Sequence, residues 1–382
     1  MFDFDKRLLK NLDWSLIVIY VLLSIIGLFA VAATTASDGV YFTSSVKRQI
    51  MWIILSYVVV AIVLFIDYRI FSQTGYLLLV LAAIILIAVL LFGPVINGSR
   101  RWIFIGQFSI QPSELAKIFF VLGFAKFLVS KRDNVNNIST LILSILIAAI
   151  PITLIYLQPD LGTSLVLVFM LISMLFVANI AWKYIITAIV ASVGATPIIW
   201  LMLKDYQKNR ILTFFNPELD PLGAAYNVIQ SRIAIGSGNW SFLSDSNIFD
   251  FSLSGKGIFA SDSMTSLKFI PAQYTDFIFS AIGEGFGFLG AGLVIVLIFL
   301  LIYRSIKIAL KAKDLYGAYV VIGLASMFLF HTWVNIGMTM GLMPVTGLPL
   351  PFISLGGSSF LVNSIALAII LNIGMRHKKI QF

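Results

Sequence analysis

The sequence of 382 residues contains no cysteine, only two histidines and few charged side chains. Charged residues make up 11% of the chain, whereas hydrophobic residues make up 60% and the mean hydropathy is +1.01. The absence of cysteine excludes disulfides and thiolate metal sites. The sequence also lacks an H-E-x-x-H motif and a Walker loop, so it carries no signature of a zinc protease or a nucleotide hydrolase.

Apolar runs of about 20 residues recur along the chain, which is the length that a helix needs to cross a bilayer core. We therefore expect an all-α integral membrane protein, a single polytopic membrane domain over residues 1–382, because helices satisfy their own backbone hydrogen bonds in lipid. Ten segments qualify as spans: 14–34, 48–66, 75–93, 112–130, 140–157, 162–181, 184–203, 275–303, 316–342 and 357–375.

The distribution of lysine and arginine predicts the orientation of these spans. With the N-terminus inside, the predicted cytoplasmic segments hold fifteen such residues and the short outer loops hold four, Lys47, Arg48, Arg100 and Arg101. Both termini are then cytoplasmic, and the large loop 204–274, between spans seven and eight, is extracytoplasmic. The net charge of +9 reflects this topology, with membrane lipids as its counterpart, and nucleic acid is not an expected partner.

The segment between the last two spans, "GLMPVTGLPLPFISLGGSSF", contains Pro344, Pro349 and Pro351. Such a backbone cannot form a regular helix. At membrane depth, an irregular backbone is tolerated only where it is buried in protein or lines a cavity. The sequence therefore predicts a re-entrant segment that forms one wall of a cavity.

Two carboxylates lie in the predicted span 275–303, and an ionised carboxylate in hydrocarbon indicates a functional site. Asp276 could simply cap this helix, but Thr275 could serve equally well, which would leave Asp276 free as a base with a pKa raised by desolvation. Glu284 follows about 12 Å further along the helix, too far to be its partner in a two-carboxylate hydrolase. We expect Glu284 in a polar network between helices.

Glu114 and Lys117 lie three residues apart in a helix that begins near Pro112. Side chains at this spacing share a helix face and can form an ion pair. The pair could fasten two helices together, or it could mark a functional cavity within the membrane.

Arg100, Arg101 and Trp102 lie in an outer loop, against the general distribution of positive charge. Tryptophan and arginine at this depth are often headgroup contacts. Guanidinium groups also bind phosphate with two hydrogen bonds, so these arginines, with Arg210 and Arg232, could bind a diphosphate.

Three further polar residues have structural alternatives. Asp160 follows Pro159 at the start of a helix on the outer side, where it could bind substrate or be only an N-terminal cap. His331 and Asn335 share a helix face, where interhelical hydrogen bonding is the expected role.

Six motifs, in this order, resemble a known family: "NGSRRWI", "QPSELAK", "QPDLGTS", "QSRIAIGSG", "TDFIFSAIGE" and "GLPLPFISLGGSS". Their order and their places among ten spans resemble the SEDS family (shape, elongation, division and sporulation). The chain looks most like the RodA branch, with the FtsW branch close behind. The resemblance extends over nearly the whole chain.

The resemblance implies a peptidoglycan glycosyltransferase that polymerises lipid II into a growing glycan strand at the outer face of the bacterial cytoplasmic membrane. It implies a class B penicillin-binding protein as the partner that cross-links the product. It also implies a catalytic carboxylate at Asp276, a working role for Trp102 and an ion pair between Glu114 and Lys117. Inverting transfer would use Asp276 as the general base and undecaprenyl diphosphate as the leaving group.

Cations would stabilise charge on that leaving group, chiefly Arg100, Arg101, Lys117 and Arg210. No intrinsic cofactor is expected, since the sequence shows no metal cage. A divalent cation, Mg²⁺ or Mn²⁺, could accompany the diphosphate.

Two other classes of function stay open. A flippase or transporter would carry its charges at the membrane midplane between repeats, whereas here they gather toward the outer ends of spans. A non-catalytic scaffold for the cross-linking enzyme is suggested by departures from the family pattern, namely Ala272, Tyr274 and Gly285. Residues 240–253 also look like an insertion.

Overall fold

The computed structural model describes residues 6–36, 40–96, 98–106, 108–223, 225–238, 255–260 and 263–376, so the insertion at 240–253 lies outside the described residues. Most of this chain is helical. The α-helices are α1 (Trp14–Thr35), α2 (Ser44–Phe65), α3 (Tyr68–Phe92), α4 (Pro112–Ser130), α5 (Ile138–Leu157), α6 (Leu161–Val177), α7 (Trp182–Met202), α8 (Asp205–Phe215), α9 (Tyr226–Ser237), α10 (Ile278–Leu310), α11 (Leu315–Thr339) and α12 (Gly357–Met375). Short 3-10 turns are η1 (Lys6–Asn11), η2 (Arg132–Asn134) and η3 (Pro217–Leu219).

Each predicted span overlaps one of these helices. Seven of them, α1, α2, α3, α5, α10, α11 and α12, are long and apolar enough to cross a membrane, and α6 is apolar but has only 17 residues. The fourth predicted span, α4, has 19 residues and contains Glu114, Lys117 and Lys126. The chain is a multi-pass membrane protein, and α8 and α9 lie in the loop predicted at 204–274.

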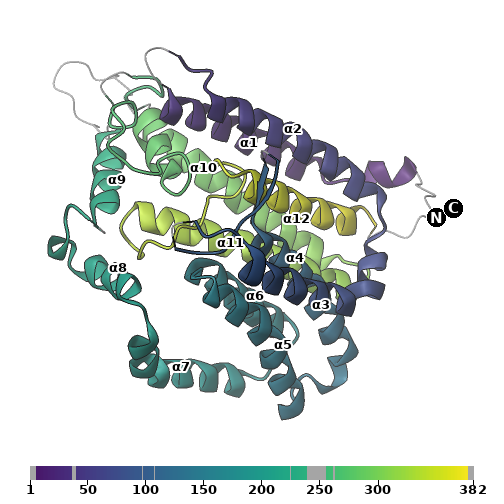
Figure 1. Cartoon of the computed structure of the whole chain (residues 1–382). Helices are drawn as coiled ribbons and strands as arrows, with labels where there is room; N and C mark the ends of the chain where they lie inside the picture. Colours follow the sequence, from purple (N-terminus) through teal and green to yellow (C-terminus); the bar gives the residue numbers. More distant parts are fainter. Residues whose placement is uncertain are drawn as a thin grey trace, which may run out of the picture.

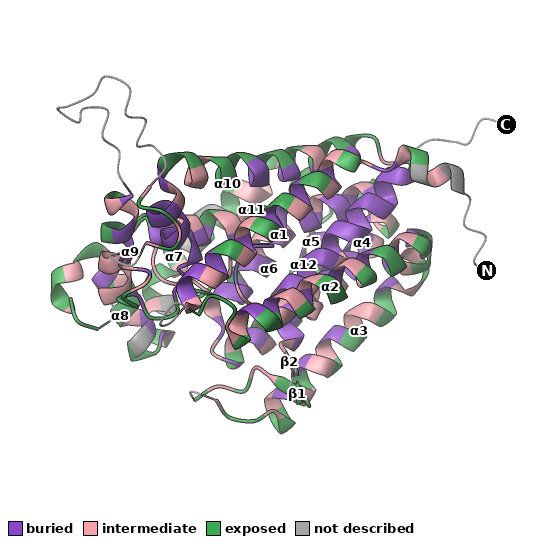
Figure 2. Cartoon of the chain, turned by 90° about the horizontal axis from the view of Figure 1, so that it is seen from above, coloured by how far each residue is buried: buried purple, intermediate pink, exposed green. Residues whose placement is uncertain are grey.

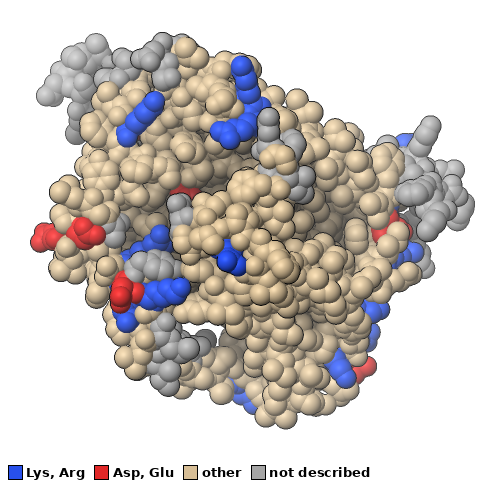
Figure 3. Space-filling view, viewed as in Figure 1, with Lys and Arg blue, Asp and Glu red and all other residues tan. Residues whose placement is uncertain are grey.

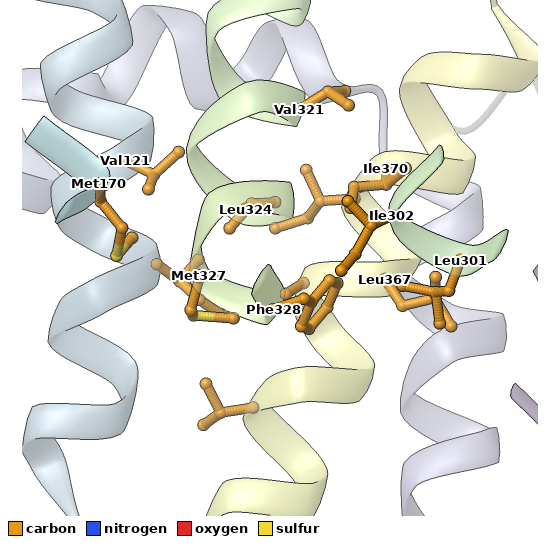
Figure 4. Packing of buried hydrophobic residues seen from close by; sticks show 14 of the residues in the cluster. Val121, Met170, Leu301, Ile302, Val321, Leu324, Met327, Phe328, Leu367 and Ile370 are labelled. Atoms are coloured by element: carbon orange, nitrogen blue, oxygen red, sulfur yellow. The ribbon is translucent and has the colours of Figure 1, made fainter. Parts of the chain in front are cut away.

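The core of the bundle is built around α11 and α12. Over its most apolar 18 residues α12 is 83% buried, compared with 22% for α2 and for α3, which therefore present most of their surface to the surroundings. Figure 2 shows the exposed faces on the outside of the bundle and the buried residues inside it. In Figure 4, Leu324, Met327 and Phe328 of α11 point toward Met170 of α6 and Leu367 of α12.

The third and the eighth predicted spans differ most from the observed helices. The third span was predicted at 75–93, but α3 begins at Tyr68, because Asp67 caps it and its polar first turns escape a search for apolar runs. The eighth span was predicted at 275–303, but α10 begins at Ile278 and extends to Leu310. Asp276 therefore precedes the helix and does not start it.

A break at Gly287 divides α10, which explains its length of 33 residues. Gly287 has φ 65° and ψ −162°, a conformation that only glycine adopts readily. The main-chain N–H groups of Lys256 and Gly257 donate to the carbonyls of Glu284 and Gly285 at 3.1 Å each, so the outer loop satisfies carbonyls at the break. The segment that contains Glu284 is thus a short helix joined to the loop before α10.

A two-stranded hairpin, which the sequence did not predict, precedes α4. Strands β1 (Ile103–Ile105) and β2 (Phe108–Ile110) pair antiparallel, with Gly106 at φ 62° in the turn between them. The hairpin follows Trp102 directly, so it sets the course of the loop between α3 and α4.

Helix α7 lies apart from the other long helices, at the bottom of Figure 1. None of its side chains that the structure describes is buried. The chain therefore leaves the bundle at α7 and returns to it through α8 and α9, which lie beside the ends of α10 and α11.

Candidate active site

The candidate site lies where the segment before α10 meets the segment between α11 and α12. The Ser354 hydroxyl donates to the carbonyl of Thr275 at 2.6 Å, and the N–H of Leu355 donates to the carbonyl of Tyr274 at 2.9 Å. These bonds join the proline-rich segment to the backbone around Asp276. The predicted irregular wall is therefore present, since residues 344–350 have no regular secondary structure.

Two side chains of α11 hold this wall in place. The amide nitrogen of Asn335 donates to the carbonyls of Asp276 at 2.9 Å and Leu348 at 2.7 Å. One turn earlier, Nδ1 of His331 lies 3.4 Å from the carbonyl oxygen of Pro349. The interhelical hydrogen bond predicted for His331 is confirmed by its contact with Lys117 of α4. For Asn335 the prediction is wrong, because its partners are backbone carbonyls outside the helices.

The backbone of Asp276 is fixed in a turn before the helix. Its N–H donates to the carbonyl of Ala272 at 3.2 Å, and Phe277 takes the cap position of α10. The side chain of Asp276 is half-buried. The expected alternative, that Asp276 caps the helix, is wrong, because the cap position belongs to the next residue.

Desolvation by burial raises the pKa of Asp276 above its ordinary value of 3.8, and the charge of Asp160 raises it further. The charge of Arg210 and a hydrogen bond from Thr275 act in the opposite direction. A carboxylate with a raised pKa is a better proton acceptor.

Space lies open beside this carboxylate at Gly347. A side-chain carbon built on Gly347 would meet only one atom within 4 Å, Oδ2 of Asp276 at 3.5 Å. Gly347 has φ +77°, where other residues are strained. The glycine thus permits the turn of the wall and leaves room next to the carboxylate. Gly347 was not among the predicted site residues, although its position between Pro344 and Pro349 indicates a special backbone conformation.

Arg210 and Arg232 lie together near the carboxylate. Both line a small pocket of about 60 Å³ between α8, α9 and the proline-rich segment. Arg210 donates to the carbonyl of Val345 at 3.1 Å, and Arg232 packs against Gly341. Figure 3 shows a hollow in this face of the molecule, with an acidic side chain recessed inside it and basic side chains nearby.

The predicted pair of Glu114 and Lys117 is confirmed, and it extends to a third residue. Nζ of Lys117 lies 2.9 Å from Oε1 of Glu114 and 2.8 Å from Nε2 of His331. All three residues are buried. Because His331 also contacts the carbonyl of Pro349, this chain of contacts links α4 through α11 to the wall of the site.

Asp160 caps α6, as one of its two predicted roles requires. Its carboxylate accepts bonds from the N–H of Thr163 at 3.1 Å, the Thr163 hydroxyl at 3.0 Å and the Gln111 amide at 3.0 Å. It is buried, and its charge acts on Asp276. The contact with Gln111 also ties the start of α6 to the start of α4.

The arginines of the outer loop have carbonyl partners in this structure. Arg100 donates to the carbonyl of Leu91 at 2.7 Å, near the end of α3. Arg101 donates to the carbonyl of Gln158 at 2.7 Å and to that of Pro159, after the end of α5. Trp102 follows them and is half-buried. The two guanidinium groups thus bind carbonyls at helix ends, which stabilises the loop.

Glu284 is fully buried and anchors the outer loop to α10. It accepts bonds from the N–H of Met264 at 2.7 Å, the N–H of Thr265 at 2.9 Å and the Thr265 hydroxyl at 2.7 Å, with Lys256 at 3.4 Å. A polar network between helices was predicted, and the hydroxyl of Ser237 at the end of α9 donates to Glu284 at 3.4 Å, but most partners are loop residues. Gln273 was not singled out, and it extends the network by bridging the carbonyls of Thr34 and Thr265 at 2.9 Å each.

The described ranges contain no group of three or more histidine, aspartate or glutamate side chains that could hold a metal ion. Asp276 and Asp160 are the carboxylates that interact at the site, and Asp160 is already hydrogen-bonded by two neighbours. These residues do not fit a resident metal centre.

Comparison with known proteins gives one family over almost the whole chain. Residues 11–379 match the family described as "Cell cycle protein", which comprises FtsW, RodA and SpoVE. Stage V sporulation protein E of Bacillus subtilis (strain 168) is 35% identical over 372 residues, which cover 94% of this chain and 96% of that protein. Peptidoglycan glycosyltransferase MrdB of Escherichia coli (strain K12) is 32% identical over 372 residues, which cover 97% and 95%.

A solved structure has the same fold. It is described as "Structural coordination of polymerization and crosslinking by a peptidoglycan synthase complex" and superposes with a TM-score of 0.81 at 28% identity, covering 96% of this chain and 98% of its own. The family match and the structural similarity therefore both extend over nearly the whole chain.

Proposed function

The chain belongs to the FtsW, RodA and SpoVE family, also known as SEDS, and from this premise we propose that it is a peptidoglycan glycosyltransferase that polymerises lipid II. The observation that carries the proposal is the half-buried carboxylate of Asp276 beside the open space at Gly347. Asp160 and Glu284 are by contrast occupied by buried hydrogen bonds, and Glu114 is buried in an ion pair with Lys117. Asp276 is thus the carboxylate that suits a proton transfer.

In the proposed reaction, Asp276 accepts the proton of the acceptor's 4-hydroxyl group. The oxygen of that hydroxyl attacks the anomeric carbon of the donor sugar from the face opposite the diphosphate. The bond from this carbon to the diphosphate oxygen breaks, and its electron pair leaves with undecaprenyl diphosphate, so the configuration inverts. A diphosphate leaves readily without a general acid, which is why one carboxylate is enough. A positioned base contributes about a hundred- to ten-thousandfold to the rate.

The leaving group needs cations, and Arg210 and Arg232 suit it. Both line the same pocket, and the charge of Arg210 acts on Asp276, so the base and this cation lie in one site. Guanidinium groups bind phosphate oxygens with paired hydrogen bonds. Arg100, Arg101 and Trp102 border the substrate from the loop between α3 and α4 in this proposal.

Lys117 contributes through position. It is fully buried between Glu114 and His331. It therefore acts on the site by holding His331, which contacts the carbonyl of Pro349. A divalent cation, Mg²⁺ or Mn²⁺, belongs to the proposal only as a companion of the diphosphate in the substrate, since the described residues form no cage for it.

The setting of the reaction is the bacterial cytoplasmic membrane, with both termini in the cytoplasm and the site at the outer face. The bias of lysine and arginine supports this orientation. A class B penicillin-binding protein is the proposed partner that cross-links the strand, and the similarity to a chain of a peptidoglycan synthase complex supports it.

The test is polymerisation of labelled lipid II by the purified protein, with and without a candidate class B partner, with glycan chains resolved on a gel. Asp276→Asn keeps the shape of the side chain but removes the base, so we expect long chains from the wild type and almost none from this variant. Thermal unfolding should show that the variant is folded.

Equal chain formation by the wild type and the Asp276→Asn variant would exclude Asp276 as the base. If neither protein makes chains with the partner present, movement of lipid II between leaflets of labelled vesicles distinguishes a flippase from a scaffold. A scaffold would move no lipid but would still stimulate cross-linking by its partner.

A further inference from the structure

A second pocket lies at the other end of the bundle from Asp276. Its volume is about 330 Å³. Its walls come from residues 11–15 at the start of α1, from the last turns of α10 and from Gly374 in α12. Arg304 is the first basic residue of α10 and follows Asp276 by 28 residues, a separation of about 40 Å at 1.5 Å per residue. The pocket is therefore separate from the proposed active site.

The pocket carries an excess of positive charge. Arg304, Lys307 and Lys311 are spaced by three and four residues, so they share one face of α10. The one carboxylate among the lining residues is Asp13, which leaves a charge of two positive units (three minus one). Within the described part of the chain, neither Lys307 nor Lys311 forms an ion pair.

Asp13 neutralises Arg304 only weakly. Its Oδ2 lies 3.6 Å from Nη1 of Arg304, which is longer than a hydrogen bond. Its other oxygen, Oδ1, is engaged by the N–H groups of Ser15 and Leu16 at the start of α1. Arg304 lines the pocket, and its guanidinium group can engage an anion with several oxygens.

The depth of the pocket matches lipid headgroups. Trp14 lines it and is 61% exposed at the start of an apolar helix, the usual place of tryptophan at a membrane interface. Apolar residues also line the pocket, among them Leu12 and Ile308, and Gly374 of α12 packs closely against Ile308. A ligand for this pocket would thus combine an anionic head with an apolar body.

We propose that this pocket binds the phosphate headgroup of an anionic phospholipid, with Arg304, Lys307 and Lys311 around the phosphate and Trp14 against the glycerol region. Basic pockets between membrane helices on the cytoplasmic side recognise such headgroups, and the proposed orientation puts this pocket on that side. The inference goes beyond polymerisation, because the pocket does not contact Asp276.

The test is native mass spectrometry of the purified protein with equal amounts of palmitoyl-oleoyl phosphatidylglycerol and palmitoyl-oleoyl phosphatidylcholine. The wild type should retain phosphatidylglycerol preferentially. In the double variant Lys307→Gln/Lys311→Gln this preference should fall about thirtyfold, since two basic side chains are removed and each contributes about 1 kcal/mol near the surface. The matched control is Lys131→Gln/Lys183→Gln, which removes the same charge outside the pocket and should keep the preference.

Equal retention of the two lipids, or equal losses in the two double variants, would overturn the proposal, since general surface charge would then explain any binding. If inorganic phosphate at the same concentration as phosphatidylglycerol removes that lipid, the site binds a free anion and the assignment to lipid is wrong. Lipid II polymerisation by Lys307→Gln/Lys311→Gln in a fixed lipid mixture should be unchanged, so failure here is distinguishable from failure of the proposed reaction.

Discussion

The side-chain amide of Asn335 lies 2.9 Å from the main-chain oxygen of Asp276, so a residue in the middle of the bundle fixes the backbone of the proposed base. The same nitrogen holds the wall of the site through the carbonyl of Leu348. One side chain therefore sets the distance between the base and the surface that faces it.

Replacement of this amide should damage catalysis more than folding. We expect Asn335→Ala to lower the kcat of polymerisation about a hundredfold, because a displacement of about 1 Å in a catalytic group costs that much. The loss in stability should be about 1–3 kcal/mol, the range for an unsatisfied buried group. Lipid II polymerisation and thermal unfolding measure the two effects.

Asn372 provides a matched control. Its amide also donates to several carbonyls, those of Val63 and Leu64 at 2.8 and 3.2 Å and of Ile66 at 2.6 Å, but far from the site. Asn372→Ala should lose similar stability and keep its kcat. If both variants lose activity in proportion to stability, Asn335 has no positioning role.

The pH dependence of polymerisation should identify Asp276 as the base. Activity should fall at acidic pH as Asp276 is protonated, with an apparent pKa above the ordinary 3.8 because burial raises it. Arg210 lowers this pKa, so Arg210→Gln should move the acidic limb of kcat/KM to higher pH. Arg232→Gln removes an equal charge from the same pocket and should weaken binding without moving the limb.

The same shift has a consequence for stability. The folded chain binds this proton more tightly than the unfolded chain does, so the contribution of Asp276 to stability is present at low pH and is lost as pH rises through its raised pKa.

For the activity profile, an acidic limb that Arg210→Gln does not move, measured in a stable preparation, would mean that a group other than Asp276 controls activity.

For the buried ion pair of Glu114 and Lys117, we expect a single substitution to destabilise the protein more than the double substitution does. Lys117→Met leaves the carboxylate of Glu114 buried without its partner, which should cost about 3–5 kcal/mol of stability. The double variant Glu114→Leu/Lys117→Met removes both charges and should be more stable than Lys117→Met alone. Thermal unfolding of both single variants and the double variant gives the coupling between the two residues.

The double variant also separates positioning from binding. Because His331 loses its contact with Lys117, the wall at Pro349 should be less well fixed, and kcat should fall while KM for lipid II stays the same. A large rise in KM would instead assign Lys117 to the substrate, as the sequence first suggested.

Local sequence patterns predicted the parts of this site that depend on one helix. The pair of Glu114 and Lys117 follows from helical spacing, and the cap at Asp160 follows from its place before α6. The irregular wall between α11 and α12 follows from its prolines. Each of these depends on residues close together in the chain, where geometry is nearly fixed by sequence.

The features that sequence missed depend on contacts between distant segments. The break at Gly287 is accompanied by the approach of Gly255, and a side-chain carbon on Gly255 would clash with the Gly287 nitrogen. The start of α10 after Asp276 depends on bonds from Ser354 and Leu355, nearly eighty residues away. No local pattern around 275–287 encodes these partners, so hydrophobicity alone made the helix start too early.

Gly347 gives the sharpest test of where the acceptor sugar lies. Its φ of +77° permits alanine only with strain, and the new methyl group would stand about where space is now open beside Oδ2 of Asp276. Strain in this region costs about 1–2 kcal/mol. We expect Gly347→Ala to lose most of its polymerising activity, because the methyl group would displace the hydroxyl group that Asp276 must deprotonate.

Gly106→Ala controls for strain alone, since Gly106 has φ +62° and nothing within 4 Å of a built side-chain carbon, at the tip of the β1–β2 hairpin. Both variants should lose similar stability in thermal unfolding, but only Gly347→Ala should lose kcat/KM for the acceptor. If the two variants polymerise equally well when folded, the acceptor does not bind beside Gly347, and Asp276 would have to reach its hydroxyl group from another side.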